Sequence, residues 1–177
     1  MRCVFCPKNR GNRGVREHNL THHGRPAPRK LLAAVGDPKS YREVVFCGFG
    51  KPTLRLKILI AVATEIRRLA GRVRVNTDGL ANLVHRSNVL PQLAQCVDAL
   101  SVSMNAQDAD IYERYCRPLL PGSYEAMLDF LAQAPNYIPE VTATAIEGLT
   151  GVDTGACRQI AHIRNAGFRV RYLDILG

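Results

Sequence analysis

Short apolar runs rich in Val and Ile alternate along the chain with stretches whose apolar residues recur at helical spacing. The strand-like runs cover residues 43–50, 73–76, 99–105, 141–146 and 168–175. Helical spacing is found at about 58–69, where one apolar face ends at Gly71, and again at about 88–95, 124–134 and 154–165. This order predicts an α/β protein built from repeated βα units, with five strands.

Parallel strands connected by helices close into a barrel or remain an open doubly wound sheet, and periodicity does not distinguish the two. In both architectures ligands bind at the carboxyl ends of the strands. Three turns rich in Gly, Asn and Asp are predicted at that edge, at residues 48–52, 76–79 and 103–105. These residue types also form ordinary tight turns, so each turn alone is weak evidence for a site.

The net charge of +9 is concentrated near the N-terminus. Residues 1–42 hold 10 Lys or Arg against Glu17 and Asp37, a net of +8, which leaves +1 for the remaining residues. Such a segment can bind nucleic acid or an anionic small molecule, or can be a solvated loop. Because few aromatic residues are interleaved with these charges, nucleic acid is the least favoured partner.

No segment has the length and composition of a membrane span or of a secretory signal, so we expect a cytoplasmic protein that does not associate with a membrane. Its six cysteines are then expected to be reduced thiols, some of them metal ligands. Cys47, Cys96, Cys116 and Cys157 occur singly, which is typical of buried cysteines that act as small hydrophobic residues.

Cys3-Val-Phe-Cys6 places two thiolates close enough to hold one metal centre, without identifying the metal. One possibility is zinc, because His18 and His22 follow with nearly the spacing of a nucleic-acid-binding zinc finger. Residues 7–17 are almost wholly polar, however, and offer little for the small core of such a finger. His18, His22 and the neighbouring His23 are therefore expected to be loop residues.

Several motifs together resemble the radical S-adenosylmethionine (radical SAM) superfamily. They are Cys3-Val-Phe-Cys6, a strand ending in Gly48-Phe-Gly-Lys-Pro52, and strands ending in Asn76-Thr-Asp-Gly79 and Ser103-Met-Asn105. The chain is most similar to the TatD-associated group of that superfamily, over nearly its whole length. That similarity lies in Cys6-Pro-Lys-Asn-Arg10, Val44-Val-Phe-Cys-Gly-Phe-Gly50, Arg74-Val-Asn-Thr-Asp-Gly-Leu-Ala-Asn82 and Tyr112-Glu-Arg-Tyr-Cys-Arg-Pro118.

The resemblance implies a partial TIM barrel of six βα units, of which five strands are visible. Residues 1–177 would form one core domain lacking its first strand, with a basic loop and first helix in 1–42 and the βα repeats in 43–177. The implied enzyme uses a 4Fe-4S cluster to cleave S-adenosylmethionine reductively and to generate a 5'-deoxyadenosyl radical. Its partners would be an unknown substrate, an electron donor such as a flavodoxin or ferredoxin, and functionally a TatD-family nuclease.

The resemblance also implies roles for individual residues. Cys3 and Cys6 would be cluster ligands, and Phe5 would lie near the adenine of SAM. The turn formed by Gly48, Phe49, Gly50, Lys51 and Pro52 would receive the SAM amino group. Asn76, Asp78, Ser103 and Asn105 would be candidates for contacts to the ribose and the carboxylate.

Cys116 is a candidate catalytic residue because it follows the strand that ends at Asn105. We expect an accessible thiolate, favoured by the charges of Arg114 and Arg117, with a buried thiol at a helix end as the alternative.

Two departures from the superfamily pattern keep other functions open. The first cluster cysteine is expected four residues before Cys3 and thus ahead of Met1, which predicts that Met1 is an internal start. Lys51 stands where the superfamily has Glu, so a cation would face the SAM ammonium. The alternatives are an inactive scaffold that binds no cluster and, less favoured, the zinc-binding module.

Overall fold

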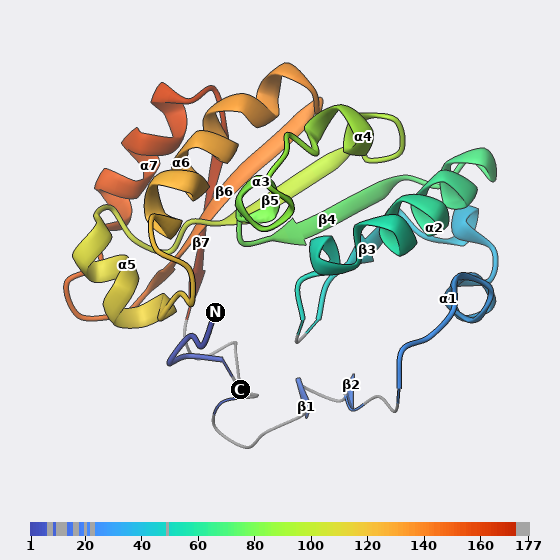
Figure 1. The fold of residues 1–177 in the computed structure, drawn as a ribbon, viewed down its shortest axis with the longest axis horizontal. Coiled ribbons are helices and arrows are strands. Elements are labelled where there is room, and N and C mark those ends of the chain that lie inside the picture. Colours follow the sequence, from blue (N-terminus) through green and yellow to red (C-terminus); the bar gives the residue numbers. More distant parts are fainter. Residues whose placement is uncertain are drawn as a thin grey trace.

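A computed structural model of the chain describes residues 1–6, 9, 14–15, 18–19, 21, 24–48 and 50–172. Five parallel strands form one sheet in the order β3-β4-β5-β6-β7 (Figure 1). They are β3 (Val44–Phe46), β4 (Val73–Thr77), β5 (Ala99–Ser103), β6 (Glu140–Glu147) and β7 (Gly167–Tyr172). Spatial order follows chain order without the reversal that defines a doubly wound sheet, so the predicted α/β partial barrel is confirmed.

Helices connect successive strands. They are α2 (Leu56–Arg68), α3 (Ala81–His85), α4 (Leu90–Ala94), α5 (Ala109–Cys116), α6 (Ser123–Gln133) and α7 (Thr154–Ile163). Short 3-10 helices lie at Pro38–Ser40, Pro52–Arg55 and Ala134–Asn136. None of the helices in the described ranges is long and apolar enough to cross a membrane.

The N-terminal part of the chain precedes the sheet. It contains the two-residue antiparallel strands β1 (Gly14–Val15) and β2 (His18–Asn19), followed by α1 (Pro28–Val35), which packs against α2. His22, His23 and the side chain of His18 lie outside what the structure describes, as does Phe49. The histidines of the zinc alternative and one residue of the predicted SAM turn therefore have no position here.

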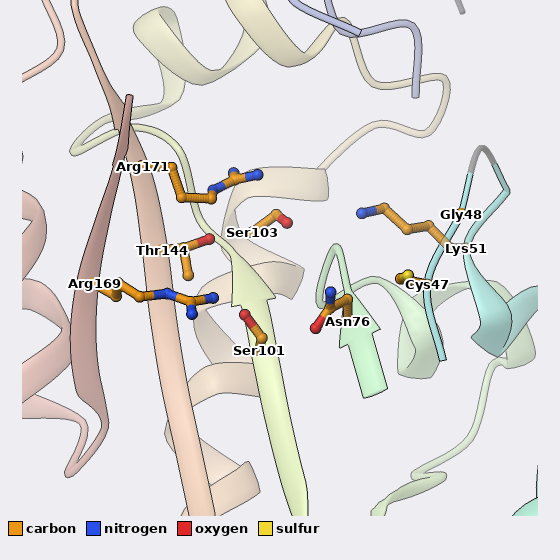
Figure 2. A pocket seen from close by; sticks show the side chains of 9 residues that line it. All are labelled: Cys47, Gly48, Lys51, Asn76, Ser101, Ser103, Thr144, Arg169 and Arg171. Carbon is orange, nitrogen blue, oxygen red and sulfur yellow. The ribbon is translucent and has the colours of Figure 1, made fainter. Parts of the chain in front are cut away.

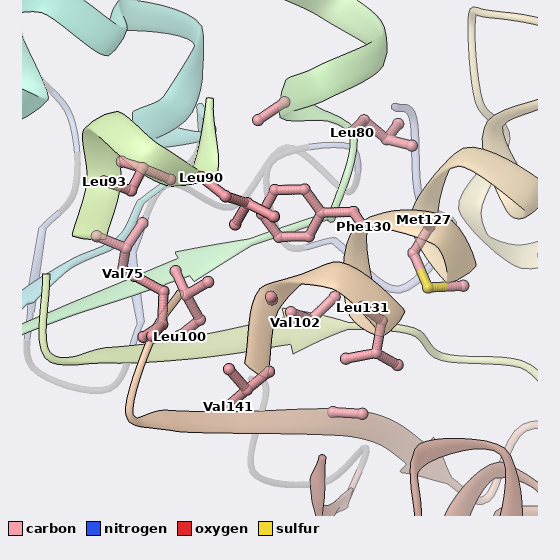
Figure 3. Close-up of a cluster of buried hydrophobic side chains, with 14 of the residues drawn as sticks. Val75, Leu80, Leu90, Leu93, Leu100, Val102, Met127, Phe130, Leu131 and Val141 are labelled. Atoms are coloured by element: carbon pink, nitrogen blue, oxygen red, sulfur yellow. The ribbon is translucent and has the colours of Figure 1, made fainter. Parts of the chain in front are cut away.

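One face of the sheet is apolar and packs against the helices. Val75 of β4, Leu100 and Val102 of β5 and Val141 of β6 meet the side chains of α4 and α6 (Figure 3). Phe130 from α6 lies at the centre of this layer and is fully buried. Since side chains alternate across a strand, the residues between these apolar positions point to the opposite face.

That opposite, inner face is polar. At the amino ends of the strands the Arg74 Nε lies 2.9 Å from a Glu43 carboxylate oxygen, and its Nη2 lies 2.7 Å from a Glu140 oxygen. The hydrogen bond to Glu43 is the main cause of a raised pKa for Arg74. Charge at this end of the inner face is therefore balanced within the chain.

Candidate functional site

The loop that carries Cys3 and Cys6 lies against the C-terminal end of α5. The Arg2 amide donates to the Cys116 carbonyl at 3.2 Å, and the Val4 amide donates to the Tyr115 carbonyl at 2.9 Å. A turn brings Cys6 back toward Cys3, because the Cys6 amide donates to the Cys3 carbonyl at 3.1 Å. Asn105, which follows the carboxyl end of β5, lies with its Nδ2 3.4 Å from the Cys116 Sγ, so both cysteines lie on the carboxyl side of the sheet.

Cys3 and Cys116 form a hydrogen-bonded thiol pair. This bond is the largest cause of a pKa of about 7 for Cys3; burial opposes the shift and the nearby charge of Lys51 adds to it. The same bond, together with burial, raises the pKa of Cys116. Cys3 is thus the thiol of the pair that ionises first, and Cys116 stays protonated as the donor.

Cys116 is completely buried, so the prediction of an accessible thiolate is wrong, and the alternative of a buried helix-end thiol holds. The reason is that Cys116 occupies the last turn of α5, with its side chain turned toward the sheet and covered by the N-terminal loop. The residue nevertheless lies beside Cys3, although the two are far apart in the sequence.

Asn105 connects the thiol pair to the sheet. Its Nδ2 lies 3.4 Å from the Cys116 Sγ, and its Oδ1 accepts a hydrogen bond from the Arg171 Nη2 at 2.7 Å. Its backbone amide donates to the Thr144 carbonyl at 3.0 Å. Asn105 has φ 66°, a left-handed conformation that Asn tolerates better than most residues.

A cavity of about 160 Å³ opens on the inner face at the carboxyl ends of the strands (Figure 2). It is lined by Cys47, Gly48, Lys51, Asn76, Ser101, Ser103, Thr144, Arg169 and Arg171. Lys51 points into it from the loop after β3, opposite Arg169 and Arg171 of β7 (Figure 2). Two buried polar atoms of the lining, Asn76 Oδ1 and Arg171 Nε, have no hydrogen-bond partner among the described residues.

The structure brings together only part of the predicted cofactor site. Gly48, Lys51, Asn76 and Ser103 line the cavity, and Asn105 lies beside it. Three other predicted residues lie elsewhere: Phe5 packs on the hydrophobic core, Asp78 accepts from the Leu80 amide within its own turn, and Pro52 begins a 3-10 helix. Gly50 is exposed and is not among the lining residues.

The lining residues Ser101, Thr144, Arg169 and Arg171 were not predicted from the sequence. The expectation that Cys47 is buried is wrong, because it is exposed in the loop after β3 and lines the cavity. A signal for the arginines was present, since Phe168-Arg-Val-Arg171 alternates apolar and charged residues within a strand. Alternation of this kind indicates that one face of the strand is polar.

Cys3 and Cys6 are the described residues best suited to hold a metal, because their thiols share one turn. Across the described ranges, however, no group of three His, Cys, Asp or Glu side chains is arranged to bind a metal ion. Two thiolates alone do not complete the coordination of a cluster or of zinc. A third ligand has to be added to this pair.

No protein-family model matches the chain, and no curated protein sequence matches it significantly. Among solved structures it is similar to a radical SAM methyltransferase from Sphaerobacter thermophilus, with 16% identity and a TM-score of 0.57. That match covers 98% of this chain and 64% of the methyltransferase. A domain of the pyruvate-formate lyase-activating enzyme from Bacteroides vulgatus ATCC 8482 matches 73% of this chain and 98% of its own length, with 13% identity and a TM-score of 0.46. The similarity to the methyltransferase shows that this chain has the fold of a radical SAM enzyme.

Proposed function

We propose that this chain is the core of a radical SAM enzyme of the TatD-associated group, with Cys3 and Cys6 as two ligands of a 4Fe-4S cluster. The observation that carries the proposal is the position of the Cys-x2-Cys loop. It lies at the carboxyl side of a parallel sheet, next to a polar cavity, in a fold shared with a radical SAM methyltransferase. The assignment of the chain to the TatD-associated group rests on the four sequence motifs alone.

The chemistry of the loop suits iron. Thiolates are the ligands of iron–sulfur clusters, and a pKa of about 7 makes the Cys3 thiolate available at neutral pH. When bound, such a cluster supplies the electron that cleaves SAM. Cys116 and Asn105 would orient Cys3 through the hydrogen bonds described above. In the superfamily spacing, the third thiolate would come four residues before Cys3.

Lys51 does not fit the role that its position in the motif implies. Its side chain points into the cavity, so a SAM ammonium held there would face a like charge. We therefore assign the SAM amino group to no described side chain, and we expect Lys51→Glu to tighten SAM binding if the motif does hold that group. Equal affinity of the two proteins for SAM would remove residues 48–52 from the cofactor site.

Anaerobic reconstitution with iron and sulfide tests the cluster. Three forms are compared: the chain itself, a form with Cys-Ala placed before Met1, and a matched form with Ser-Ala there. We expect the Cys-Ala form, which completes Cys-x3-Cys-x2-Cys, to take up about four irons and to develop the broad visible absorbance of a 4Fe-4S cluster. The Ser-Ala form should take up much less. Equal iron contents in the two forms would reject the superfamily spacing.

Cysteine variants of the Cys-Ala form identify the other ligands. Cys3→Ser and Cys6→Ser should each lose the cluster, whereas Cys157→Ala, a change in α7 on the helix side of the sheet, should keep it. If no form binds iron, the chain is a scaffold without a cluster. Stoichiometric zinc that is lost in His18→Ala and His22→Ala would instead establish the zinc-binding module.

A further inference from the structure

Cationic side chains on the inner face of the sheet are paired with carboxylates at one end of the strands and unpaired at the other. At the amino ends of the strands, Arg74 is bonded to both Glu43 and Glu140. At the carboxyl ends, Lys51, Arg169 and Arg171 have no ion pair with any described residue, and no carboxylate lines the cavity around them. Three positive charges therefore converge on one cavity without a carboxylate from the described part of the chain, although the Cys3 thiolate lies near enough to interact with Lys51 and Arg171.

Of the three, Arg171 is held in place by a hydrogen bond, whereas Arg169 is exposed to solvent. Arg171 is partly buried, and Asn105 fixes one end of its guanidinium at 2.7 Å. Burial, with the charge of Arg169 as a second cause, lowers the pKa of Arg171. The Arg171 Nε remains a buried donor without a partner among the described residues, and a buried donor of this kind costs free energy until a ligand accepts from it.

The other lining groups indicate a polar ligand. The hydroxyl side chains of Ser101, Ser103 and Thr144 lie between the cations (Figure 2). The Asn76 Oδ1 is a hydrogen-bond acceptor without a donor among the described residues. Ligand pockets usually measure about 300–1,000 Å³, so a cavity of about 160 Å³ is sized for a small molecule or for one end of a larger one. The lining contains no aromatic ring, among the described residues, on which a base or a flat apolar group could stack.

We infer that this cavity binds an oxyanion, a carboxylate or a phosphate, on a small polar substrate, with Arg169 and Arg171 as its main ligands and Lys51 closing the opposite side. Arginine pairs well with both groups because its planar fork donates two parallel hydrogen bonds. The identification of this ligand as a substrate rests on the proposed function. The anion site itself rests only on the cavity.

The position of Arg169 separates this ligand from the cysteine loop. Arg171 is linked through Asn105 to Cys116, which lies beside Cys3, whereas Arg169 lies one pleat repeat earlier on β7, opposite Thr144 of β6. Two residues along a strand correspond to about 6–7 Å. An anion on Arg169 would therefore lie closer to the amino ends of the strands than a group bound at the cysteine loop.

The test is calorimetric titration of the metal-free 177-residue chain with sodium phosphate and, separately, with malonate. We expect saturable binding of at least one probe, and the stronger probe identifies phosphate or carboxylate as the substrate group. Arg169→Gln should weaken binding about tenfold or more, because it removes a charge-assisted hydrogen bond. Lys57→Gln, which removes an exposed charge on α2, should change affinity less than about twofold, because a solvent-exposed charge at a distance is screened. Added sodium chloride should weaken binding in the wild type.

Equal affinity of the wild type and Arg169→Gln, with both shown to be folded by circular dichroism, would overturn the inference. Displacement of the bound probe by S-adenosylhomocysteine would overturn the assignment to substrate, since the cavity would then hold the cofactor's own carboxylate. The titration requires no cluster. An anion site that depends on Arg169, combined with a Cys-Ala form that takes up no iron, would therefore reject the enzyme and retain the binding site.

Discussion

At the scale of single residues, Asn105 is the point where the sheet, the thiol pair and the cationic cavity meet. Its side chain contacts Cys116 on one side and Arg171 on the other, while its left-handed backbone turns the chain away from β5. The choice of Asn satisfies both requirements, because Asn is one of the few residues with a polar side chain of this length that tolerates positive φ.

Substitutions of Asn105 should separate the contribution of its side-chain hydrogen bonds to stability from that of its backbone conformation. We expect Asn105→Ala to destabilise the fold by about 3 kcal/mol, because it leaves a buried Arg171 donor unpaired and places Ala at positive φ. Asn105→Gly should cost about 1 kcal/mol less, since Gly relieves the backbone strain but not the lost bonds. Urea unfolding of the two variants measures the difference. Identical midpoints would show that the backbone at this position is unstrained.

The thiol pair predicts a pH dependence of alkylation. Only the thiolate reacts, so the rate for Cys3 should rise with pH and reach half its maximum at a pH of about 7. Cys116→Ala removes the hydrogen bond that stabilises the thiolate and should move this midpoint up, toward the ordinary value of 9.0. Mass spectrometry after timed iodoacetamide treatment follows the site.

Cys157 serves as an internal control for that experiment. It is buried, and burial raises its pKa to about 12, so it should stay unlabelled across the same pH range. An unchanged Cys3 profile in Cys116→Ala would show that the thiol pair does not set the reactivity of Cys3.

At the scale of elements, the turn after β4 fixes how α6 packs on the sheet. Gly79 has φ 75°, and a Cβ at this position would lie 2.9 Å from the Met127 Cγ of α6 and 3.2 Å from the Val102 Cγ1 of β5. The turn thus requires Gly for two independent reasons, its backbone conformation and the absence of space.

Gly79→Ala should therefore destabilise the protein by about 2–4 kcal/mol, from positive φ and from overpacking together. Gly122→Ala is the matched control, because Gly122 has φ 65° but a Cβ added there would meet nothing within 4 Å. We expect that control to cost about 1 kcal/mol, from the backbone alone. Urea midpoints compare the two variants, and equal losses would mean that Met127 moves aside without cost.

The sequence predicted the elements in proportion to the strength of their patterns. All five strands of the sheet were predicted, and the helices near 58–69, 124–134 and 154–165 correspond to α2, α6 and α7. The missed helix α5 buries only Tyr112 and Cys116, too few positions to give a visible period. Helix α3 is a five-residue element whose one buried residue is Ala81, so it carries no periodic signal either.

At the scale of the whole molecule, parallel strands in chain order explain why distant residues share one site. The loops after β3, β4 and β5 all open on the same side, and this much could be predicted from the βα repeat. The contact of Cys3 with Cys116 could not, because it depends on how the N-terminal loop hydrogen-bonds to the end of α5. The inner arginines were missed because strands in parallel sheets are expected to be apolar on both faces.

The position of β7 at the end of the strand order has a consequence for self-association. Among the described residues β7 is paired only with β6, so its other edge offers backbone groups to which a second chain could add. Arg169 and Arg171 place two charges along this strand, and charges on an edge strand oppose such pairing. The residues that we assign to the ligand would then also keep the protein monodisperse. Arg169→Thr/Arg171→Thr should increase light scattering on concentration, whereas Lys57→Gln/Arg114→Gln, with the same loss of charge on helices, should not. If Arg169 and Arg171 were replaced by uncharged residues to bind an uncharged ligand, some other feature would have to prevent a second chain from pairing with the edge of β7.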